Sequence, residues 1–328
     1  MDEKIKKIAV LTSGGDAPGM NAAIRAVVRS CAYHELRCVG VFRGLQGLIE
    51  GDFKDMGPRS VKNIINRGGT LLKSARSKDF HTPEGRQKAH AHLIHAGIDA
   101  LVVIGGDGTF TGAKVFMEEY NFPIVGIPGT IDNDINGTDY TVGYDTALNT
   151  VVEAIDKIRD TANSHNRLFL IEVMGRDAGD IALNAGIGAG AEEILIPEQD
   201  LGRERLITSL KRSKKSGKSS SIVVVAEGDQ SGKNIFELAD YVRENLDDYE
   251  VKVTVLGHIQ RGGSPSCFDR VLASRLGVGA VDALKAGLKG IMIGIANNKI
   301  VHVPFDIAIK GEAKIDLDLI RVADITSV

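Results

Sequence analysis

Two apolar runs, each followed directly by a glycine-rich polar turn, constrain this chain more than any other feature. The first is LVVIGGDGT, residues 101–109, and the second is PIVGIPGTIDND, residues 123–134. Continuous apolar runs of this length indicate strands that are buried on both faces, as in parallel sheets. Because parallel strands end at a common sheet edge, we expect the two polar turns to lie together, where α/β proteins bind their ligands.

Further apolar runs of strand length alternate along the chain with stretches of helical spacing. One such stretch places Met20, Ile24, Val27 and Cys31 on one face of a helix. The alternation predicts an α/β fold of mostly parallel sheets flanked by helices. The expected strands are Ile8–Leu11, Val39–Phe42, Leu101–Ile104, Ile124–Ile127, Leu168–Val173, Ile194–Ile196, Ile222–Ala226, Val251–Leu256 and Ile291–Ile295.

The length and charge of the chain limit its organisation and its partners. At 328 residues it exceeds what one core usually serves, so we expect two lobes with a cleft. The formal net charge of −3 gives no general attraction to nucleic acid or membrane, so an anionic ligand requires local Arg and Lys groups. The first residues lack the apolar core of a signal peptide and no run is long enough to span a membrane, so we expect a cytoplasmic protein.

The polar groups of the two turns suit phosphoryl transfer. The first turn, residues 105–109, exposes backbone amides beside the Asp107 carboxylate, which suits polyphosphate oxygens and a hard divalent cation. In the second turn Asp132 and Asp134 follow Thr130, and Asp132 is the expected general base for an acceptor hydroxyl. Our hypothesis is a magnesium nucleotide at the first turn and the acceptor beside the second.

Other glycine-rich turns are less specific on their own. SGGDAPGMN at residues 13–21 suits backbone binding of a phosphate, although a tight structural turn would look identical. INRGGTLLKSAR brings Arg67 and Arg76 to loops, where a guanidinium either stabilises a transferring phosphoryl group or is a solvated surface residue. In LGHIQRGGSP, His258 and Arg261 form a candidate phosphate-binding pair, while a lone histidine is more often structural.

Taken together and in this order, the motifs resemble a known family. TSGGDAPGMNAAIR, INRGGT, GGDGT, PGTIDND, VMGR and GHIQRGGSP closely resemble the bacterial-type ATP-dependent 6-phosphofructokinases, from about Ile8 to beyond Arg275. The resemblance implies transfer of the γ-phosphoryl group of ATP to the 1-hydroxyl of fructose 6-phosphate, with Mg²⁺, as a step of glycolysis. The segments Asn136–Val142 and His258–Pro265 are the expected lobe boundaries, so we expect an ATP-binding lobe of residues 1–139 with about 258–310, and a sugar-phosphate-binding lobe of about 140–257 with the C-terminal tail. The active site would lie in the cleft.

The resemblance also assigns roles to single residues. Asp132 matches the base that accepts the hydroxyl proton, Asp107 the carboxylate that organises Mg²⁺, and Asp134 a supporting neighbour. The implied catalytic residues are Asp132, Asp134, Arg76, Arg176 and Thr130. The implied ATP-binding residues are Gly15, Arg76, Ser77, Gly105, Gly106, Asp107, Gly108 and Thr109. The implied sugar-phosphate residues are Thr130, Ile131, Asp132, Arg167, Met174, Gly175, Arg176, Glu227, Lys252, His258, Ile259, Gln260 and Arg261.

Two glycines bear on the phosphoryl donor. Relatives that use pyrophosphate place an aspartate where this chain has Gly108 and a lysine where it has Gly129, so both positions favour ATP. A carboxylate at 108 would repel the α-phosphate of ATP. The alternatives are a pyrophosphate-dependent phosphofructokinase and a non-catalytic nucleotide or sugar-phosphate sensor. The set of Asp107, Asp132 and two arginines argues against a sensor, because binding alone requires no base.

The resemblance implies a homotetramer whose subunits complete one another's sugar-phosphate sites and hold an effector, ADP or phosphoenolpyruvate, at an interface. The effector residues that match are Arg25, Arg29, Arg159, Gly190, Glu192 and Lys218, with Arg59 one position from an expected arginine. Other positions depart from the family: Pro58, Asn63 and Ser216 replace charged or polar ligands. We therefore expect altered or weakened effector binding, because charge-assisted phosphate contacts are lost.

The neighbouring subunit would supply Arg167 and a second arginine, and this chain has Lys252 at the second position. Lysine keeps the charge and loses the bidentate fork, so we predict a weaker hold on the sugar phosphate. Lys252→Arg should lower the KM for fructose 6-phosphate in steady-state assays at saturating ATP. An unchanged or raised KM would contradict this interpretation.

Overall fold

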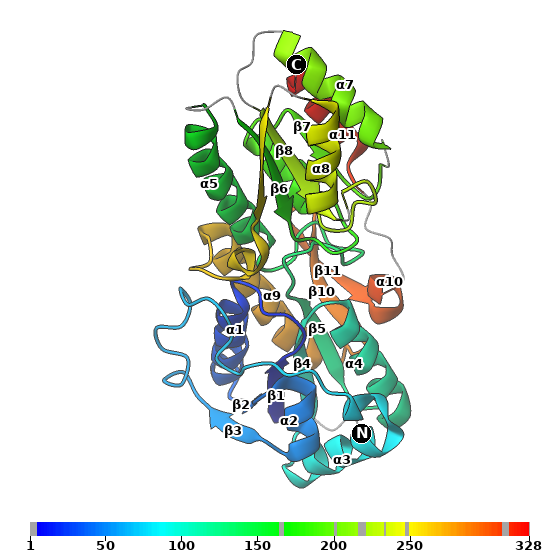
Figure 1. The fold of residues 1–328 in the computed structure, drawn as a ribbon. Helices are drawn as coiled ribbons and strands as arrows, with labels where there is room; N and C mark the ends of the chain where they lie inside the picture. The colour runs from blue at the N-terminus through cyan, green and yellow to red at the C-terminus, as the bar shows by residue number, and fades with distance from the viewer. Residues whose placement is uncertain are drawn as a thin grey trace. The chain divides into compact units, whose positions relative to one another are not determined.

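A computed structural model describes residues 5–163, 167–199, 202–215, 221–232, 234–246, 249–309 and 315–327. The chain divides into two compact units, Met1–Thr146 with Arg261–Glu312 and Ala147–Gln260 with Ala313–Val328. Each unit has its own sheet (Figure 1). The predicted α/β class, with mostly parallel sheets flanked by helices, is confirmed. Among the described residues, no helix is long and apolar enough to cross a membrane.

The first unit contains the strands that were expected within residues 8–127 and at residues 291–295. Its elements are β1 (Lys7–Thr12), α1 (Met20–Tyr33), β2 (Arg37–Val41), α2 (Gly44–Glu50), β3 (Phe53–Met56), η1 (Asp79–His81), α3 (Pro83–His95), β4 (Ala100–Gly105), α4 (Asp107–Tyr120), β5 (Ile124–Pro128), α9 (Cys267–Lys285), β10 (Ile291–Ala296), β11 (Lys299–Pro304) and α10 (Phe305–Ile309). Helix α5 (Tyr144–Asn163) begins in this unit, and η2 (Gly257–Arg261) ends in it.

The described strands of the first unit form one sheet in the order β11-β10-β5-β4-β1-β2-β3. The five inner strands are parallel, and the two edge strands, β3 and β11, are antiparallel to their neighbours. Sequence analysis missed both edges. Neither edge strand is a continuous apolar run, because β11 (KIVHVP) is largely accessible to solvent and β3 (FKDM) is short and charged.

Helices cover both faces of this sheet (Figure 1). Alternate strand residues such as Leu11 and Val103 pack with Phe110, Phe116 and Phe305 from α4 and α10, in a core that also takes in α2 and α3. On the opposite face α1 packs against α9. Burial of alternating residues on both faces explains why the inner strands are apolar throughout.

The second unit contains a smaller sheet in the order β7-β8-β6-β9, with every described pairing parallel. Leu206, Leu210, Leu238 and Val242 on α7 and α8 pack against its strands. Besides most of α5, the elements are β6 (Arg167–Val173), α6 (Asp180–Gly188), β7 (Glu193–Leu195), α7 (Gly202–Lys215), β8 (Ser221–Ala226), α8 (Ile235–Asn245), β9 (Glu250–Val255) and α11 (Leu317–Thr326).

A buried carboxylate fixes the start of α5. Asp269, in the first turn of α9, accepts hydrogen bonds from the backbone N–H groups of Gly143 and Thr146, both at 2.8 Å, and from the Thr146 hydroxyl at 2.5 Å. Ser266 accepts a hydrogen bond from the Asp269 N–H at 3.2 Å and donates one to the Asp145 carboxylate at 2.5 Å. Asp269 of α9 therefore caps the start of α5, while Ser266 caps α9 and joins it to Asp145.

Burial raises the pKa of Asp269 to about 6, although the hydrogen bonds from Thr146 and Gly143 oppose the shift. The folded pKa thus lies above the unfolded value of about 3.9, and the folded protein binds more protons between the two values. The stability contributed by this group is therefore present below about pH 4 and falls as the pH rises to about 6. Asp269→Asn cannot titrate, so its stability deficit should be largest near pH 4 and smaller above pH 6, by on the order of 2 kcal/mol.

Urea unfolding of wild type and Asp269→Asn across this pH range measures the difference. Asp79→Asn, at an exposed carboxylate on η1, serves as the matched control and should show no comparable trend. A deficit for Asp269→Asn that is constant or grows with pH would contradict the expected shift.

Candidate active site

The sheet of the first unit has a topological switch point between β1 and β4. From β1 the chain moves to β2 on one side, and β4 pairs with β1 on the other. Hydrogen bonds beyond the strands join the turns that follow: the Ser13 N–H donates to the Ile104 carbonyl at 2.9 Å, and the Gly129 N–H to the Gly105 carbonyl at 3.0 Å. The turns after β1, β4 and β5 therefore meet at the edge where such sheets bind ligands.

The turn after β4 is shaped as an anion site. At Gly105, a Cβ atom would lie 2.4 Å from Thr109 Oγ1 and 2.5 Å from the Ser13 carbonyl oxygen, so only glycine fits. At Gly108, a Cβ atom would meet no heavy atom of the described residues within 4 Å. Packing therefore does not explain Gly108, and the space beside it is open at the N-terminus of α4, where backbone N–H groups attract phosphate.

Asp107 fits a magnesium site. Its Oδ1 atom is buried and has no hydrogen-bond partner among the described residues. A buried carboxylate oxygen in that state is costly unless a ligand satisfies it. No three His, Cys, Asp or Glu side chains of the described residues form a metal cluster. Mg²⁺ commonly uses one or two carboxylates together with phosphate oxygens and water, which matches a single carboxylate beside a phosphate-binding turn.

The turn after β5 holds Asp132 wholly buried. Its backbone is fixed by Thr141, whose hydroxyl donates to the Thr130 carbonyl at 2.7 Å and whose N–H donates to Asn133 Oδ1 at 2.9 Å. Asn133 has a φ of 53°, in the left-handed region that asparagine tolerates. The chain thus turns sharply between the two carboxylates, and Asp134, two residues on, is half-buried.

The loop that carries Arg67 and Arg76 is tied to α1 by Asn21, a residue that sequence analysis missed. The Asn21 side chain donates to the carbonyls of Arg67 and Gly68 at 3.1 and 3.2 Å and accepts from the Leu71 N–H at 2.6 Å. Asn21 is buried. Its signal was its polarity inside an otherwise apolar helix face, where a buried amide requires partners.

Gly15 and Arg261, expected at the nucleotide and at the sugar phosphate respectively, lie together in the first unit. A Cβ atom at Gly15 would be 2.5 Å from Arg261 Nη1, and this nitrogen donates to the Asp16 carbonyl at 3.2 Å. Any side chain at position 15 would displace the Arg261 guanidinium from this position. The motif pattern alone could not reveal this contact, because the two residues are far apart in the sequence.

In the second unit, Glu227 and Gln260 organise the turn after β6. Glu227 Oε1 accepts the backbone N–H groups of Gly175 and Arg176 at 3.2 and 2.7 Å, and Gln260 Oε1 accepts that of Met174 at 3.0 Å. Gln260 is fully buried. Arg176 has a φ of 54°, a costly backbone conformation for arginine that the glutamate stabilises. Arg176 as a whole is exposed to solvent.

The remaining residues expected at the sugar phosphate lie on η2, β6 and β9 of the second unit. His258 and Ile259 are exposed on η2. Arg167 and Lys252 share one counter-ion, Glu250, at 2.7 and 2.5 Å. The hydrogen bond from Lys252, followed by that from Arg167, lowers the pKa of Glu250 to about 2. The two cations predicted to bind a phosphate are therefore held side by side by one carboxylate.

The residues expected at an effector site are distributed over both units. Arg25 and Arg29 lie on α1, and burial followed by repulsion from Arg29 lowers the pKa of Arg25. Arg59 is exposed in the same unit. In the second unit, Arg159 Nη2 donates to the carbonyls of Ala189 and Gly190 at 2.6 and 2.8 Å, and its Nη1 lies 4.0 Å from Glu192. Lys218 lies outside the described residues.

Each unit thus defines an α/β ligand-binding fold in which polar turns gather at the carboxyl ends of parallel strands. The family model described as Phosphofructokinase matches residues 7–284. The chain belongs to the phosphofructokinase family, as its motifs predicted. The ATP-dependent 6-phosphofructokinase 2 of Bacteroides thetaiotaomicron is 53% identical over 318 residues, 97% of each chain. The ATP-dependent 6-phosphofructokinase of Halalkalibacterium halodurans is 55% identical over 326 residues, 99% of this chain and 100% of the relative.

A solved structure gives the same result for the fold. Phosphofructokinase from Pichia pastoris in the T-state superposes with a TM-score of 0.89 and 38% identity. The match covers 94% of this chain and 36% of the Pichia pastoris chain. Nearly the whole described architecture is therefore shared with one part of a larger member of the family.

Glu227→Ala should destabilise the turn after β6, because two backbone N–H groups lose their acceptor, at a cost of about 1–3 kcal/mol. The amides of Gly175 and Arg176 should exchange with solvent on the order of 10-fold faster, as measured by hydrogen exchange. Glu227→Gln retains an acceptor oxygen and should have a smaller effect. Glu244→Ala, at an exposed position on α8, is the matched control, and equal exchange in all three variants would rule out this role.

Proposed function

We propose that this protein transfers the γ-phosphoryl group of ATP to the 1-hydroxyl of fructose 6-phosphate, giving fructose 1,6-bisphosphate and ADP, in glycolysis. The observation that carries the assignment is the meeting of the turns after β4 and β5, GGDGT and PGTIDND, at one sheet edge. It is supported by relatives named ATP-dependent 6-phosphofructokinase that are more than half identical over nearly the full length.

We assign nucleotide binding to the first unit. The backbone amides of Gly105–Thr109 would bind the phosphate chain, and Asp107 would hold Mg²⁺, whose chemistry when bound is neutralisation of phosphate charge. The open space at Gly108 supports ATP over pyrophosphate as donor, because a carboxylate there would occupy the position beside the phosphate chain. Gly15, Arg76 and Ser77 complete the proposed nucleotide site.

Asp132 is the proposed general base. Its carboxylate takes the proton of the 1-hydroxyl while the new bond forms between that oxygen and the γ-phosphorus and the bond to the β-phosphate oxygen breaks. Arg76 and Arg176 would stabilise charge on the transferring group, and Thr130 and Asp134 would support the base. Burial of Asp132 on a turn fixed by Thr141 supports this role, because positioning accounts for much of the catalysis of phosphoryl transfer.

We assign the sugar phosphate to the turns around Glu227, Gln260 and Met174–Arg176, together with Thr130–Asp132, His258, Ile259 and Arg261. Arg167 and Lys252 would reach the site of a neighbouring subunit in a homotetramer. An effector, ADP or phosphoenolpyruvate, would bind more weakly than in other members because several anion-binding side chains are replaced. These assignments follow the family and the local contacts described above.

The test is a coupled assay of fructose 6-phosphate phosphorylation with ATP or pyrophosphate as donor. Wild type should use ATP and form ADP only when the sugar phosphate is present. Asp132→Asn should lower kcat by about 10²- to 10⁴-fold while the KM for ATP changes little, because the base acts in the transition state. Asp55→Asn, at an exposed carboxylate on β3, is the control.

Three results would overturn the proposal. Phosphorylation with pyrophosphate but not ATP would assign the other donor class. ADP formation that does not depend on the sugar phosphate would exclude the acceptor. Full activity of Asp132→Asn would exclude this residue as the base.

A further inference from the structure

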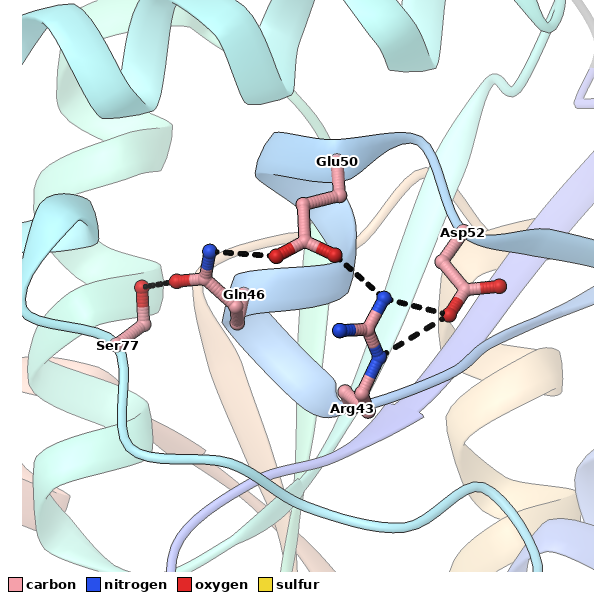
Figure 2. Close-up of polar contacts among 5 residues, drawn as sticks. All are labelled: Arg43, Gln46, Glu50, Asp52 and Ser77. Atoms are coloured by element: carbon pink, nitrogen blue, oxygen red, sulfur yellow. Dashed lines mark hydrogen bonds and ion pairs between the residues drawn. The ribbon is translucent and has the colours of Figure 1, made fainter.

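A chain of polar side chains connects Ser77 with α2 in the first unit (Figure 2). The Ser77 hydroxyl donates to Gln46 Oε1 at 2.7 Å, and Gln46 Nε2 donates to Glu50 Oε1 at 2.8 Å. The other oxygen of Glu50 pairs with Arg43, whose Nε and Nη2 donate to Asp52 at 3.2 and 3.0 Å. Every member of the chain therefore has a partner within the group.

The direction of these hydrogen bonds fixes the Gln46 amide. The Phe80 N–H donates to Ser77 Oγ at 3.3 Å, which leaves the hydroxyl proton of Ser77 for Gln46. The amide nitrogen must then face Glu50, and the hydrogen bond from Gln46, with the pairing to Arg43, lowers the pKa of that carboxyl. Aligned donors that end on a carboxylate strengthen one another.

Helix α2, which carries Gln46, is held at both ends. Arg43 precedes α2 with a φ of 64°, a conformation that is unfavourable for arginine, and its guanidinium contacts Glu50 at the end of the helix and Asp52 beyond it. These ion pairs lie across a helix of seven residues. Gln46 therefore projects from a short helix whose two ends are joined by one side chain.

The loop of Arg76 is anchored on both sides, by Arg43 and Thr12 before it and by α2 after it. Before Arg76, the Arg43 N–H donates to the Leu72 carbonyl at 2.8 Å, and the Thr12 hydroxyl donates to the Lys73 carbonyl at 2.9 Å. After Arg76, the anchor is the hydrogen bond between Ser77 and Gln46. Only residues 74–76 lie between the two anchors, so a shift of Ser77 would move the backbone of Arg76 directly.

We propose that Gln46 is a positioning residue for the phosphoryl donor. It acts through Ser77 on the backbone that presents Arg76, and so on the fit of the nucleotide phosphates and of the transferring group. The inference rests on the proposed function, in which Arg76 and Ser77 contact ATP. The Gln46 side chain hydrogen-bonds to Ser77 and Glu50, and neither of these residues is among those proposed for fructose 6-phosphate.

Gln46→Leu removes both hydrogen bonds with little change of size. We expect the KM for ATP and the Kd for a fluorescent ADP analogue to rise about 3- to 10-fold, since one hydrogen bond typically contributes this much. The kcat should also fall, because Arg76 is displaced, and the KM for fructose 6-phosphate should stay within 2-fold, or about the error of such assays. Gln87→Leu, at an exposed position on α3, is the matched control and should leave all these values unchanged.

A double-mutant cycle separates this relay from a general loss of structure. Ser77→Ala should raise the KM for ATP at least as much as Gln46→Leu does, and the double variant should be no worse than Ser77→Ala alone. Additive effects, or a KM for fructose 6-phosphate that moves together with that for ATP, would overturn the inference. So would an unchanged ATP KM in Gln46→Leu when wild type is active.

The nucleotide-binding measurement also distinguishes this inference from the proposed function. If wild type fails to phosphorylate fructose 6-phosphate, the proposed function falls, and the Kd of the ADP analogue still tests Gln46. If wild type is active and the Kd does not change in Gln46→Leu, only the role of Gln46 is lost.

Discussion

Parallel strands all end at the same edge of their sheet, and the arrangement of this protein's chemistry depends on that constraint. In the first unit β1, β4 and β5 deliver three glycine-rich turns to one edge, where backbone hydrogen bonds from Ser13 and Gly129 tie them together. Close approach of these turns leaves no room for a side chain at Gly105. Backbone amides, which are already fixed by the sheet, can then bind phosphate oxygens without ordering a flexible side chain.

The second unit uses the same constraint with different chemistry. There the turn after β6 is held through its N–H groups by Glu227 and Gln260, which follow β8 and β9. Three strand ends again meet, and this time side-chain oxygens from two of them fix the backbone of the third. This arrangement places Arg176 in an unfavourable left-handed backbone conformation, which the surrounding hydrogen bonds maintain.

The sequence predicted what depends on local pattern. Each inner strand is a continuous apolar run, so the strands were located to within a residue or two, and the polar turns followed from their positions after the runs. The antiparallel edges were missed because one-sided burial removes that signal. Contacts such as Gly15 with Arg261, or Glu250 between Arg167 and Lys252, join distant segments, and no spacing rule within one segment can predict them. Asn21 is an intermediate case. Its polar side chain on an apolar helix face indicates a buried group that requires hydrogen bonds, but its partners could not be predicted from the sequence.

The first unit is discontinuous in the chain: its sheet is completed by β10 and β11, which follow the whole of residues 147–260. During synthesis, strands β1 to β5 emerge well before β10, which pairs with β5, and before α9, which packs against α1. The second unit, apart from α11, is one uninterrupted segment and can form its sheet first. A nascent chain that stops before residue 291 therefore exposes the edge of β5 as a template for pairing.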